Sequence, residues 1–308
     1  MTTRLYSHPI HLDHLTPPGH PERPDRLRAI AKVLEHEAFA SLDRVQSPMG
    51  SSEAILLAHP KHYVDRIEAA IPEIGMARID ADTSVSPKSW EAALTGVGAA
   101  CAAVDDVFEG RAANVFVAAR PPGHHAEKIK AMGFCLFNNA AIAARHAQKA
   151  HGAERVAIVD WDVHHGNGTQ DIFWTDPSVL YCSTHQMPLY PGTGARDETG
   201  VGNIVNAPLA ADTDGDVFRE AFESRILPAL DAFRPDLIIV SAGFDAHHRD
   251  PLAEINLVED DFSWATGKLM DRAARFSSNR LVSLLEGGYD LQGLALSVAA
   301  HVGRLMKG

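Results

Sequence analysis

Residues 156–170 read VAIVDWDVHHGNGTQ and join the pattern of a buried strand to a polar turn. The first four residues, 156–159, are apolar and mostly β-branched, which predicts a strand covered on both faces. Asp160, Asp162 and His164 follow at a spacing of two, which would place their side chains on one side of the chain. The stretch therefore predicts a polar site at the end of a buried strand.

Four other segments have the same apolar pattern, and helical patterns lie between them. Strands are expected at 114–117, 179–182, 237–240 and 281–285, and helices at 25–37, 87–108, 138–151, 217–231, 264–276 and 291–306. Ser86 and Pro87 have the chemistry of a helix start, and Gly110 suits a left-handed helix end. The alternation predicts an α/β fold with a parallel sheet, whose ligand sites lie beyond the carboxyl ends of the strands.

The composition fits one globular domain. The chain has 308 residues, of which 45% are hydrophobic and 22% charged. It contains no repeat of fixed period and no long flexible linker, so we expect a single domain over residues 1–308.

Charge and cysteine content narrow the classes of function. Asp and Glu number 40 against 28 Lys and Arg, and the net charge of -12 disfavours binding to a phosphate backbone. Three cysteines without CxxC spacing indicate neither a disulfide framework nor a thiolate zinc site. Because the chain has no secretory h-region and no run of roughly 18 apolar residues, we expect a soluble cytoplasmic protein without a membrane partner. The oligomeric state stays open, a homo-oligomer included.

A second acidic segment is expected at the same edge of the sheet. Residues 238–252 read IIVSAGFDAHHRDPL and carry Asp245 beyond a strand. Together, Asp162, His164 and Asp245 would offer a divalent cation two carboxylates and one imidazole, with a position left for water, as in catalytic metal sites. The alternative is that Asp160 and Asp162 cap a turn and that His164 is an ordinary polar residue.

Two further segments end in groups suited to amide hydrolysis. Residues 115–139 read VFVAARPPGHHAEKIKAMGFCLFNN and present His124 and His125 after a stiff turn. Imidazoles, with an ordinary pKa of about 6.5, suit general acid–base catalysis, although an exposed histidine pair is the alternative. Residues 281–291 read LVSLLEGGYDL, where two glycines would let Tyr289 reach a site and donate to an oxyanion, unless this tyrosine is structural.

Taken together, these segments resemble the histone deacetylase superfamily, in particular its class II members and the bacterial acetylpolyamine and acetoin-utilisation relatives. The resemblance begins at GHPERPDRLRAI (residues 19–30), continues through RPPGHH, GFCLFNNAAIAAR, VDWDVHHGNGTQ and SAGFDAHHRDPL, and ends at LEGGYDL, in family order. It implies an arginase/deacetylase-like three-layer fold, with one mostly parallel sheet of about eight strands flanked by helices. It also implies a zinc-dependent amidohydrolase that deacylates acyl-lysine side chains or small acylated amines through a metal-bound water.

The resemblance assigns a role to each matching residue. The metal ligands match Asp162, His164 and Asp245. The catalytic groups match the His124–His125 pair, their supports Asp160 and Asn167, and the oxyanion donor Tyr289. The substrate channel matches Gly133, Phe134 and Tyr190, with Leu252 at the rim. Asp82, in the DADTSVSP segment, is a candidate for holding the substrate backbone, with a solvated turn carboxylate as the alternative.

Family members also carry an acetate tunnel and alkali-metal sites. Arg26 matches the tunnel arginine, with a structural ion pair as the alternative. An inner K⁺ site would use Asp160, Asp162, His164, Ser183 and Thr184, and an outer one Phe173, Asp176 and Val179. The catalytic ion is expected to be Zn²⁺, with Fe²⁺ as the alternative, because two carboxylates and one imidazole accept either.

Three other functions remain to be weighed. Arginase-type enzymes need a further carboxylate, which SAGFD (residues 241–245) lacks. Acetylpolyamine amidohydrolases of the eukaryotic type carry a Glu seven residues after the last metal Asp, where this chain has Leu252, although Glu254 is close. A catalytically silent relative that binds acyl ligands or acts as a scaffold is the alternative of another class.

Four histidines crowd the N-terminal segment. His8, His11, His14 and His20 are expected at the surface or rim rather than in a second metal site, because prolines at 9, 17 and 18 break any helix that would align them.

Overall fold

The computed structural model describes residues 2–307, which form one eight-stranded sheet and a separate two-stranded hairpin. The sheet consists of β1 (Thr3–Ser7), β2 (Asp43–Gln46), β5 (Asn114–Val117), β6 (Val156–Asp160), β7 (Val179–Gln186), β8 (Ile204–Leu209), β9 (Leu237–Ala242) and β10 (Leu281–Leu285). Their order is β2-β1-β5-β10-β9-β6-β7-β8, and every neighbouring pair is parallel. The expected α/β fold with a sheet of eight strands is confirmed.

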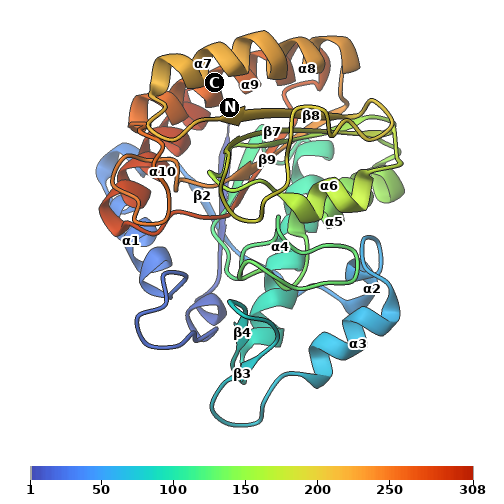
Figure 1. The fold of residues 1–308 in the computed structure, drawn as a ribbon, viewed down its shortest axis with the longest axis vertical. Coiled ribbons are helices and arrows are strands. Elements are labelled where there is room, and N and C mark those ends of the chain that lie inside the picture. Colours follow the sequence, from blue (N-terminus) through green and yellow to red (C-terminus); the bar gives the residue numbers. More distant parts are fainter. Residues whose placement is uncertain (1, 308) are drawn as a thin grey trace.

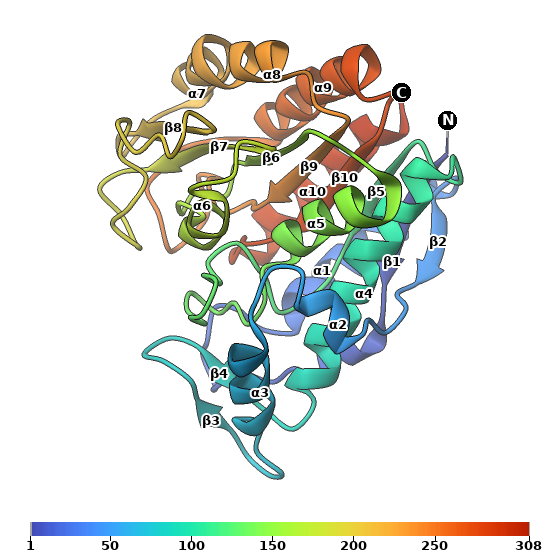
Figure 2. The ribbon, with the colours of Figure 1, turned by 90° about the vertical axis from the view of Figure 1, so that its right-hand side faces the viewer.

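Helices cover both faces of this sheet and complete a three-layer arrangement (Figures 1 and 2). One face carries α4 (Ser89–Phe108), α5 (Asn139–His151) and α6 (Asn167–Phe173), with α2 (Ser52–Ile55) and α3 (Lys61–Ala69) beside them. The other face carries α1 (Asp25–Leu34), α7 (Gly215–Ala221), α8 (Leu227–Phe233), α9 (Glu259–Phe276) and α10 (Leu291–Met306). Short 3-10 turns occupy Pro9–Leu12 and Glu37–Phe39.

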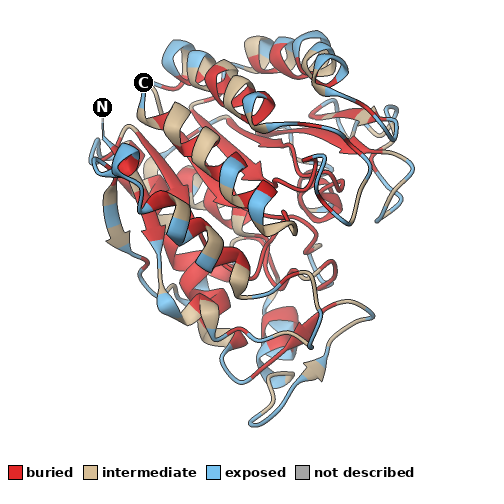
Figure 3. Ribbon diagram, turned by 90° about the vertical axis from the view of Figure 1, so that its left-hand side faces the viewer, coloured by how far each residue is buried: buried red, intermediate tan, exposed pale blue. Residues whose placement is uncertain are grey.

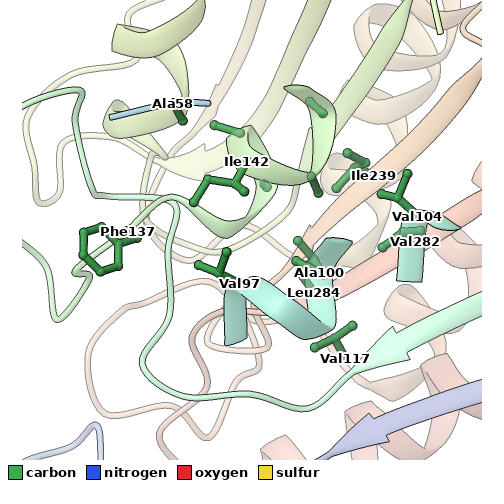
Figure 4. Close-up of a cluster of buried hydrophobic side chains, with 14 of the residues drawn as sticks. Ala58, Val97, Ala100, Val104, Val117, Phe137, Ile142, Ile239, Val282 and Leu284 are labelled. Atoms are coloured by element: carbon green, nitrogen blue, oxygen red, sulfur yellow. The ribbon is translucent and has the colours of Figure 1, made fainter. Parts of the chain in front are cut away.

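Alternation along the strands divides the core into two halves. In β5, Val115 and Val117 pack against the α4 and α5 face, whereas Phe116 packs against the α1 and α10 face. Figure 4 shows the first half, where side chains of α4, α5 and the sheet meet. Figure 3 shows the consequence, because the central strands of the sheet are buried while the outer faces of the helices and many loops are exposed.

Several helix boundaries differ from the sequence-based prediction. The helix expected from 87 begins at Ser89, because the Ser86 backbone N–H donates to the Ser89 hydroxyl in a preceding turn. The helix expected from 264 begins at Glu259, since its first turn is acidic and lacks apolar periodicity. The segment expected at 217–231 is α7, a π turn at Phe222–Ile226 and α8. Gly110 has φ 73° just beyond α4, as expected.

Strands β1, β2 and β8 were not identified as segments from the sequence. In β2 the side chains alternate between partial and full exposure, and the strand DRVQ is short and polar. The β8 strand contains Asn206 and Pro208, which weaken its pattern. Two of these strands, β2 and β8, form the two edges of the sheet, where the demand for continuous apolar residues is lowest.

The hairpin of β3 (Ala77–Arg78) and β4 (Ser84–Val85) projects from one end of the molecule beside α3 (Figures 1 and 2). Cys101, Cys135 and Cys182 are all free thiols. Within residues 2–307, no helix combines the length and the hydropathy that crossing a bilayer requires.

Candidate active site

Four adjacent strands deliver the polar groups of the candidate site. The sheet order places β5, β10, β9 and β6 next to one another, and the segments after their carboxyl ends carry His124, Tyr289, Asp245 and Asp162 respectively. Because parallel strands end at a common edge, these side chains converge there although they are far apart in sequence.

The two carboxylates and the imidazole expected to bind a metal lie together. His164 Nδ1 is 3.1 Å from Asp162 Oδ1 and 3.1 Å from Asp245 Oδ2. One ligand atom from each residue lies within 4.8 Å of the others, and all three side chains are buried. The spacing and donor chemistry fit a divalent cation, with two hard oxygen ligands and one nitrogen ligand.

Backbone groups hold these carboxylates in place. The Val163 N–H donates to Asp245 Oδ1 (2.8 Å), and the Gly287 N–H donates to Asp162 Oδ2 (2.8 Å). A Cβ on Gly287 would collide with Asp245 Oδ2, so only glycine allows this approach. The bare backbone at Gly287 thus supports the trio directly.

The charges of the trio also favour a bound cation. Burial raises the pKa of Asp245 to about 6, and the neighbouring Asp162 charge adds to this rise. Burial opposes protonation of His164, but the two carboxylates outweigh it and raise its pKa to about 10. Two buried carboxylates this close repel each other, and a cation between them relieves that repulsion.

The twin histidines face this trio. His124 Nδ1 is 3.0 Å from Asp160 Oδ2, and His125 Nδ1 is 2.8 Å from Asn167 Oδ1. Their ring centroids are 4.0 Å apart, and both rings are buried, so the alternative of an exposed pair is wrong.

The two imidazoles have opposite tendencies. Burial disfavours a charge on His124, but the carboxylates of Asp160 and Asp162 outweigh it and raise its pKa well above the ordinary value. Burial lowers the pKa of His125, and the positive charge of His124 lowers it further. A charged His124 beside a neutral His125 is the consequence.

Tyr289, His125 and His164 border one cavity. This cavity of about 230 Å³ is lined by Asp82, His125, Gly133, Phe134, His164, Leu189, Tyr190, Leu252 and Tyr289. The rings of Phe134 and Tyr289 meet edge to face at 5.9 Å, and Tyr190 meets His125 edge to face at 5.2 Å. All five residues expected in the substrate channel thus line one cavity together with His125 and His164.

The loop that carries Phe134 is fixed by the β3–β4 hairpin. Asp82 Oδ1 accepts the Gly133 N–H (3.0 Å), and the Thr83 hydroxyl accepts the Phe134 N–H (3.1 Å). Gly133 has φ 57°, and a Cβ there would collide with the His125 ring. Asp82 therefore positions the channel wall as well as lining the cavity.

Comparison with known families decides the identity of this arrangement. The model of the histone deacetylase domain matches residues 20–305. The chain belongs to the histone deacetylase family. It is 48% identical over 292 residues to an uncharacterized protein of Synechocystis, covering 93% of this chain and 94% of that protein. It is 42% identical over 277 residues to the histone deacetylase-like amidohydrolase of Pseudomonas aeruginosa, covering 88% and 73%.

A solved structure agrees closely with the fold of this histone deacetylase family member. The crystal structure of the HDA15 HD domain superposes with a TM-score of 0.94 at 38% identity, covering 99% of this chain and 90% of that one. The resemblance read from the motifs and the arginase/deacetylase-like fold are both confirmed. Membership in this family of deacetylases supports enzymatic activity.

Arg26 makes a buried network at this edge of the deacetylase fold. Its guanidinium donates to the carbonyls of Gly288 (2.6 Å) and Glu286 (2.5 Å) and pairs with Glu22 (3.1 Å). Arg120 also pairs with Glu22, and all three side chains are fully buried. The structural ion pair considered for Arg26 is therefore present, and it fixes the backbone on both sides of Gly287.

The residues expected at the alkali-metal sites fall into two groups. Ser183 lies opposite Asp160 in the β6–β7 register, and the buried Thr184 hydroxyl has no hydrogen-bond partner within the described chain. The carbonyls of Phe173, Asp176 and Val179 converge on Asn203 Nδ2, each at 2.9 Å. An amide nitrogen has only two hydrogens for three carbonyls, so this cluster has more acceptors than donors.

The N-terminal histidines correct one expectation. His11 and His14 are buried, not at the surface, with Nδ1 atoms 2.7 Å from the Arg120 carbonyl and 2.6 Å from the Ser89 hydroxyl. Their surroundings are the Arg120 network and α4, which the sequence pattern does not reveal. His20 packs edge to face on Phe134 at 4.7 Å, at the rim as expected.

Sequence reasoning missed two positioning carboxylates. Glu286 accepts the N–H groups of Gly123 (2.7 Å) and His124 (3.1 Å), so it ties the tyrosine loop to the histidine loop. Asp250 accepts the Tyr289 N–H (2.7 Å). An acidic residue directly after an apolar strand, as at Glu286, was the available signal.

Proposed function

We propose that this protein is a single-domain, metal-dependent amidohydrolase that removes acetyl or related acyl groups from lysine side chains. The observation that carries the proposal is the convergence of three kinds of group, whose members His125, His164 and Tyr289 line one aromatic-walled cavity. The three kinds are the Asp162–His164–Asp245 trio, the twin histidines and Tyr289. Each kind of group suits one task of amide hydrolysis.

Asp162, His164 and Asp245 would hold the metal ion. A divalent cation there supplies Lewis-acid polarisation of the amide carbonyl and lowers the pKa of a water molecule. Zinc is the proposed ion, with ferrous iron as the alternative, since the ligand set suits both.

The histidines divide the proton transfers between them. Because His125 Nδ1 faces the Asn167 carbonyl oxygen, Nδ1 carries the hydrogen and Nε2 is left as the acceptor. A neutral His125 takes a proton from the attacking water and returns it to the leaving amine. His124 stays charged beside Asp160 and stabilises negative charge that develops in the transition state.

Tyr289 stabilises the oxyanion. Burial and the charge of Asp245 raise the pKa of its phenol well above the ordinary value, so the phenol keeps its proton. A neutral donor fixed in place before the reaction is suited to a tetrahedral intermediate.

The cavity walls favour an acyl-lysine substrate over an acylpolyamine. Phe134 and Tyr190 offer aromatic faces to a linear aliphatic stem, and Leu252 offers an apolar rim. Glu254, the displaced candidate for an acidic gate, is exposed and its N–H donates to Gln186 Oε1 (2.8 Å). It is not among the residues that line the cavity, so a distal ammonium group finds no Glu gate there.

Two accessory sites complete the proposal. The convergence of the Phe173, Asp176 and Val179 carbonyls supports an outer potassium site, with the inner one beside Asp160 and Ser183. Arg26 remains the proposed lining of an acetate path, because its guanidinium carbon Cζ lies 5.0 Å from the centroid of the Tyr289 ring.

A substrate screen with metal-reconstituted protein tests the proposal. Acetyl-lysine peptides, longer acyl-lysine peptides and acetylpolyamines are compared by kcat/KM, and metal content is measured in parallel. The highest kcat/KM is expected on an acyl-lysine peptide. A higher value on acetylpolyamines would favour the polyamine alternative, and inactivity on every substrate with metal bound would favour the silent binding module.

A further inference from the structure

A second Asp and His cluster lies on the helices, away from the site described above. Asp105 Oδ1, on α4, is 2.7 Å from His146 Nε2 and 2.7 Å from His151 Nε2, both on α5. One ligand atom from each residue lies within 4.8 Å of the others. Three potential ligands thus meet between two helices that pack side by side (Figure 2).

The cluster lies near the amino ends of the strands, whereas the candidate active site lies beyond their carboxyl ends. Asp105 is in the last turn of α4, which ends at Phe108 before β5 begins at Asn114. His151 is the last residue of α5, before β6 begins at Val156. Both helices therefore end where strands start, whereas the catalytic groups follow the strand ends.

One histidine of the cluster is held by ring packing, and the neighbouring carboxylate is engaged elsewhere. The His151 ring stacks on Phe108 with centroids 4.7 Å apart and planes 12° apart. The adjacent carboxylate, Asp106, points away and binds the Tyr6 hydroxyl at 2.8 Å and Arg4 at 2.7 Å. Asp105 thus has the histidines as its ion-pair partners within residues 2–307.

The cluster is open to solvent as well as fixed. Its side chains are 32% exposed at Asp105, 22% at His146 and 15% at His151. An ion can enter from water, and water molecules can complete its coordination. Two imidazole nitrogens and one carboxylate oxygen are a ligand set for borderline divalent ions such as zinc, nickel or copper.

We propose that Asp105, His146 and His151 form a second metal site, which takes a divalent transition metal of the zinc class and joins α4 to α5. The competing explanation is a purely hydrogen-bonded cluster, in which both imidazoles donate Nε2–H to one carboxylate oxygen. The two explanations differ in one respect, because metal binding needs imidazole lone pairs where hydrogen bonding needs N–H groups.

Glutamine substitution separates the two explanations. In the double variant H146Q/H151Q, each amide can donate an N–H to Asp105, but neutral amides are poor ligands for zinc. Each protein is dialysed against buffered free Zn²⁺, and zinc per chain is measured by elemental analysis. The control is His62→Gln, at an exposed histidine on α3 outside the cluster.

The expected result is one zinc ion fewer per chain in the double variant than in the wild type and in H62Q. This difference does not depend on how many ions the Asp162 site holds, so it tests the second site independently of the proposed catalytic function. Asp105→Asn serves as a second variant, should the double variant not fold. Equal zinc content in the wild type and in a folded variant of either kind would overturn the proposal.

Discussion

The molecule has two trios of Asp and His, one beyond the carboxyl ends of the strands and one near their amino ends. The two trios differ in burial and in the groups that support their side chains. Asp162, His164 and Asp245 lie in turns after strands and are 0%, 8% and 0% exposed. The trio formed by Asp105, His146 and His151 lies on helix surfaces and is partly exposed. Ligand chemistry is similar at the two edges, whereas burial and support are not.

This difference shows how two related sets of Asp and His ligands can be placed in different environments. At the carboxyl edge, backbone N–H groups orient each carboxylate, and the low local dielectric strengthens every charge interaction. The proposed proton transfers by His125 and oxyanion stabilisation by Tyr289 would take place in that environment. At the amino ends of the strands, the side chains of the second trio are partly exposed and water competes with the ligands, so metal binding there is expected to act on stability.

The largest effect is expected from Asp245→Ala. Removal of this carboxylate takes away one of three ligands in a buried site, so we expect loss of the bound metal and a fall of turnover to background. Metal content and deacylation are measured together. The control is Asp216→Ala, an exposed carboxylate on α7. Full activity in D245A would place the reaction elsewhere.

Tyr289→Phe should lower turnover by about 10²–10³-fold, because one oxyanion donor is lost while the metal ligands stay. Metal content is expected to match the wild type, which separates this variant from D245A. Tyr6→Phe removes a phenol that binds Asp106 and should leave turnover unchanged. Wild-type turnover in Y289F would remove Tyr289 from the mechanism.

Asn167→Ala should lower kcat by roughly 10–100-fold, the usual loss when a partner that orients a catalytic imidazole is removed. KM should change little, since Asn167 is not among the residues that line the cavity. Asn167→Asp keeps an acceptor for His125 Nδ1 and should recover part of the loss. No difference between the alanine and aspartate variants would argue that this contact is only structural.

The smallest effect is expected at the amino edge. Zinc at tenfold above its Kd should stabilise the wild type by about 1.4 kcal/mol through the second site, a rise of roughly 2 °C in Tm. This increment should be missing in H146Q/H151Q, while deacylation stays at the wild-type level. Thermal unfolding with and without zinc measures both proteins. An equal rise in the Tm of both proteins would show that Asp105, His146 and His151 contribute no zinc-dependent stability.

The sequence predicted the inner part of the fold better than its margins. The buried strands β5, β6, β9 and β10 are continuous apolar runs because helices cover both of their faces, and their positions were predicted within two residues. The edge strand β2 has half-exposed polar side chains, so periodicity could not identify it. Helix α9 begins earlier than predicted because its first turn is acidic and lacks apolar periodicity.

The candidate site divides in the same way. The residues at strand ends, such as Asp162, Asp245 and Tyr289, were found because apolar runs lead directly into them. Asp250 and Leu189 were not, since no apolar run leads directly into them. Glu286 directly follows an apolar strand, but its contact with the His124 N–H appears only in the folded chain. The Asp105 cluster was also missed, because Asp105 and His151 are 46 residues apart and meet only when α4 packs against α5.

The sequence by itself determined the kind of chemistry, because a strand pattern ending in carboxylates and imidazoles specifies both the donor types and the edge of the sheet. Tertiary structure alone decided the distances, the burial and the resulting pKa shifts, such as the raised pKa of His124 beside the lowered pKa of His125. Those properties depend on neighbours brought in by other strands. The local sequence fixes which polar side chains each segment carries. Only packing decides which of these side chains are buried together in an environment of low dielectric constant.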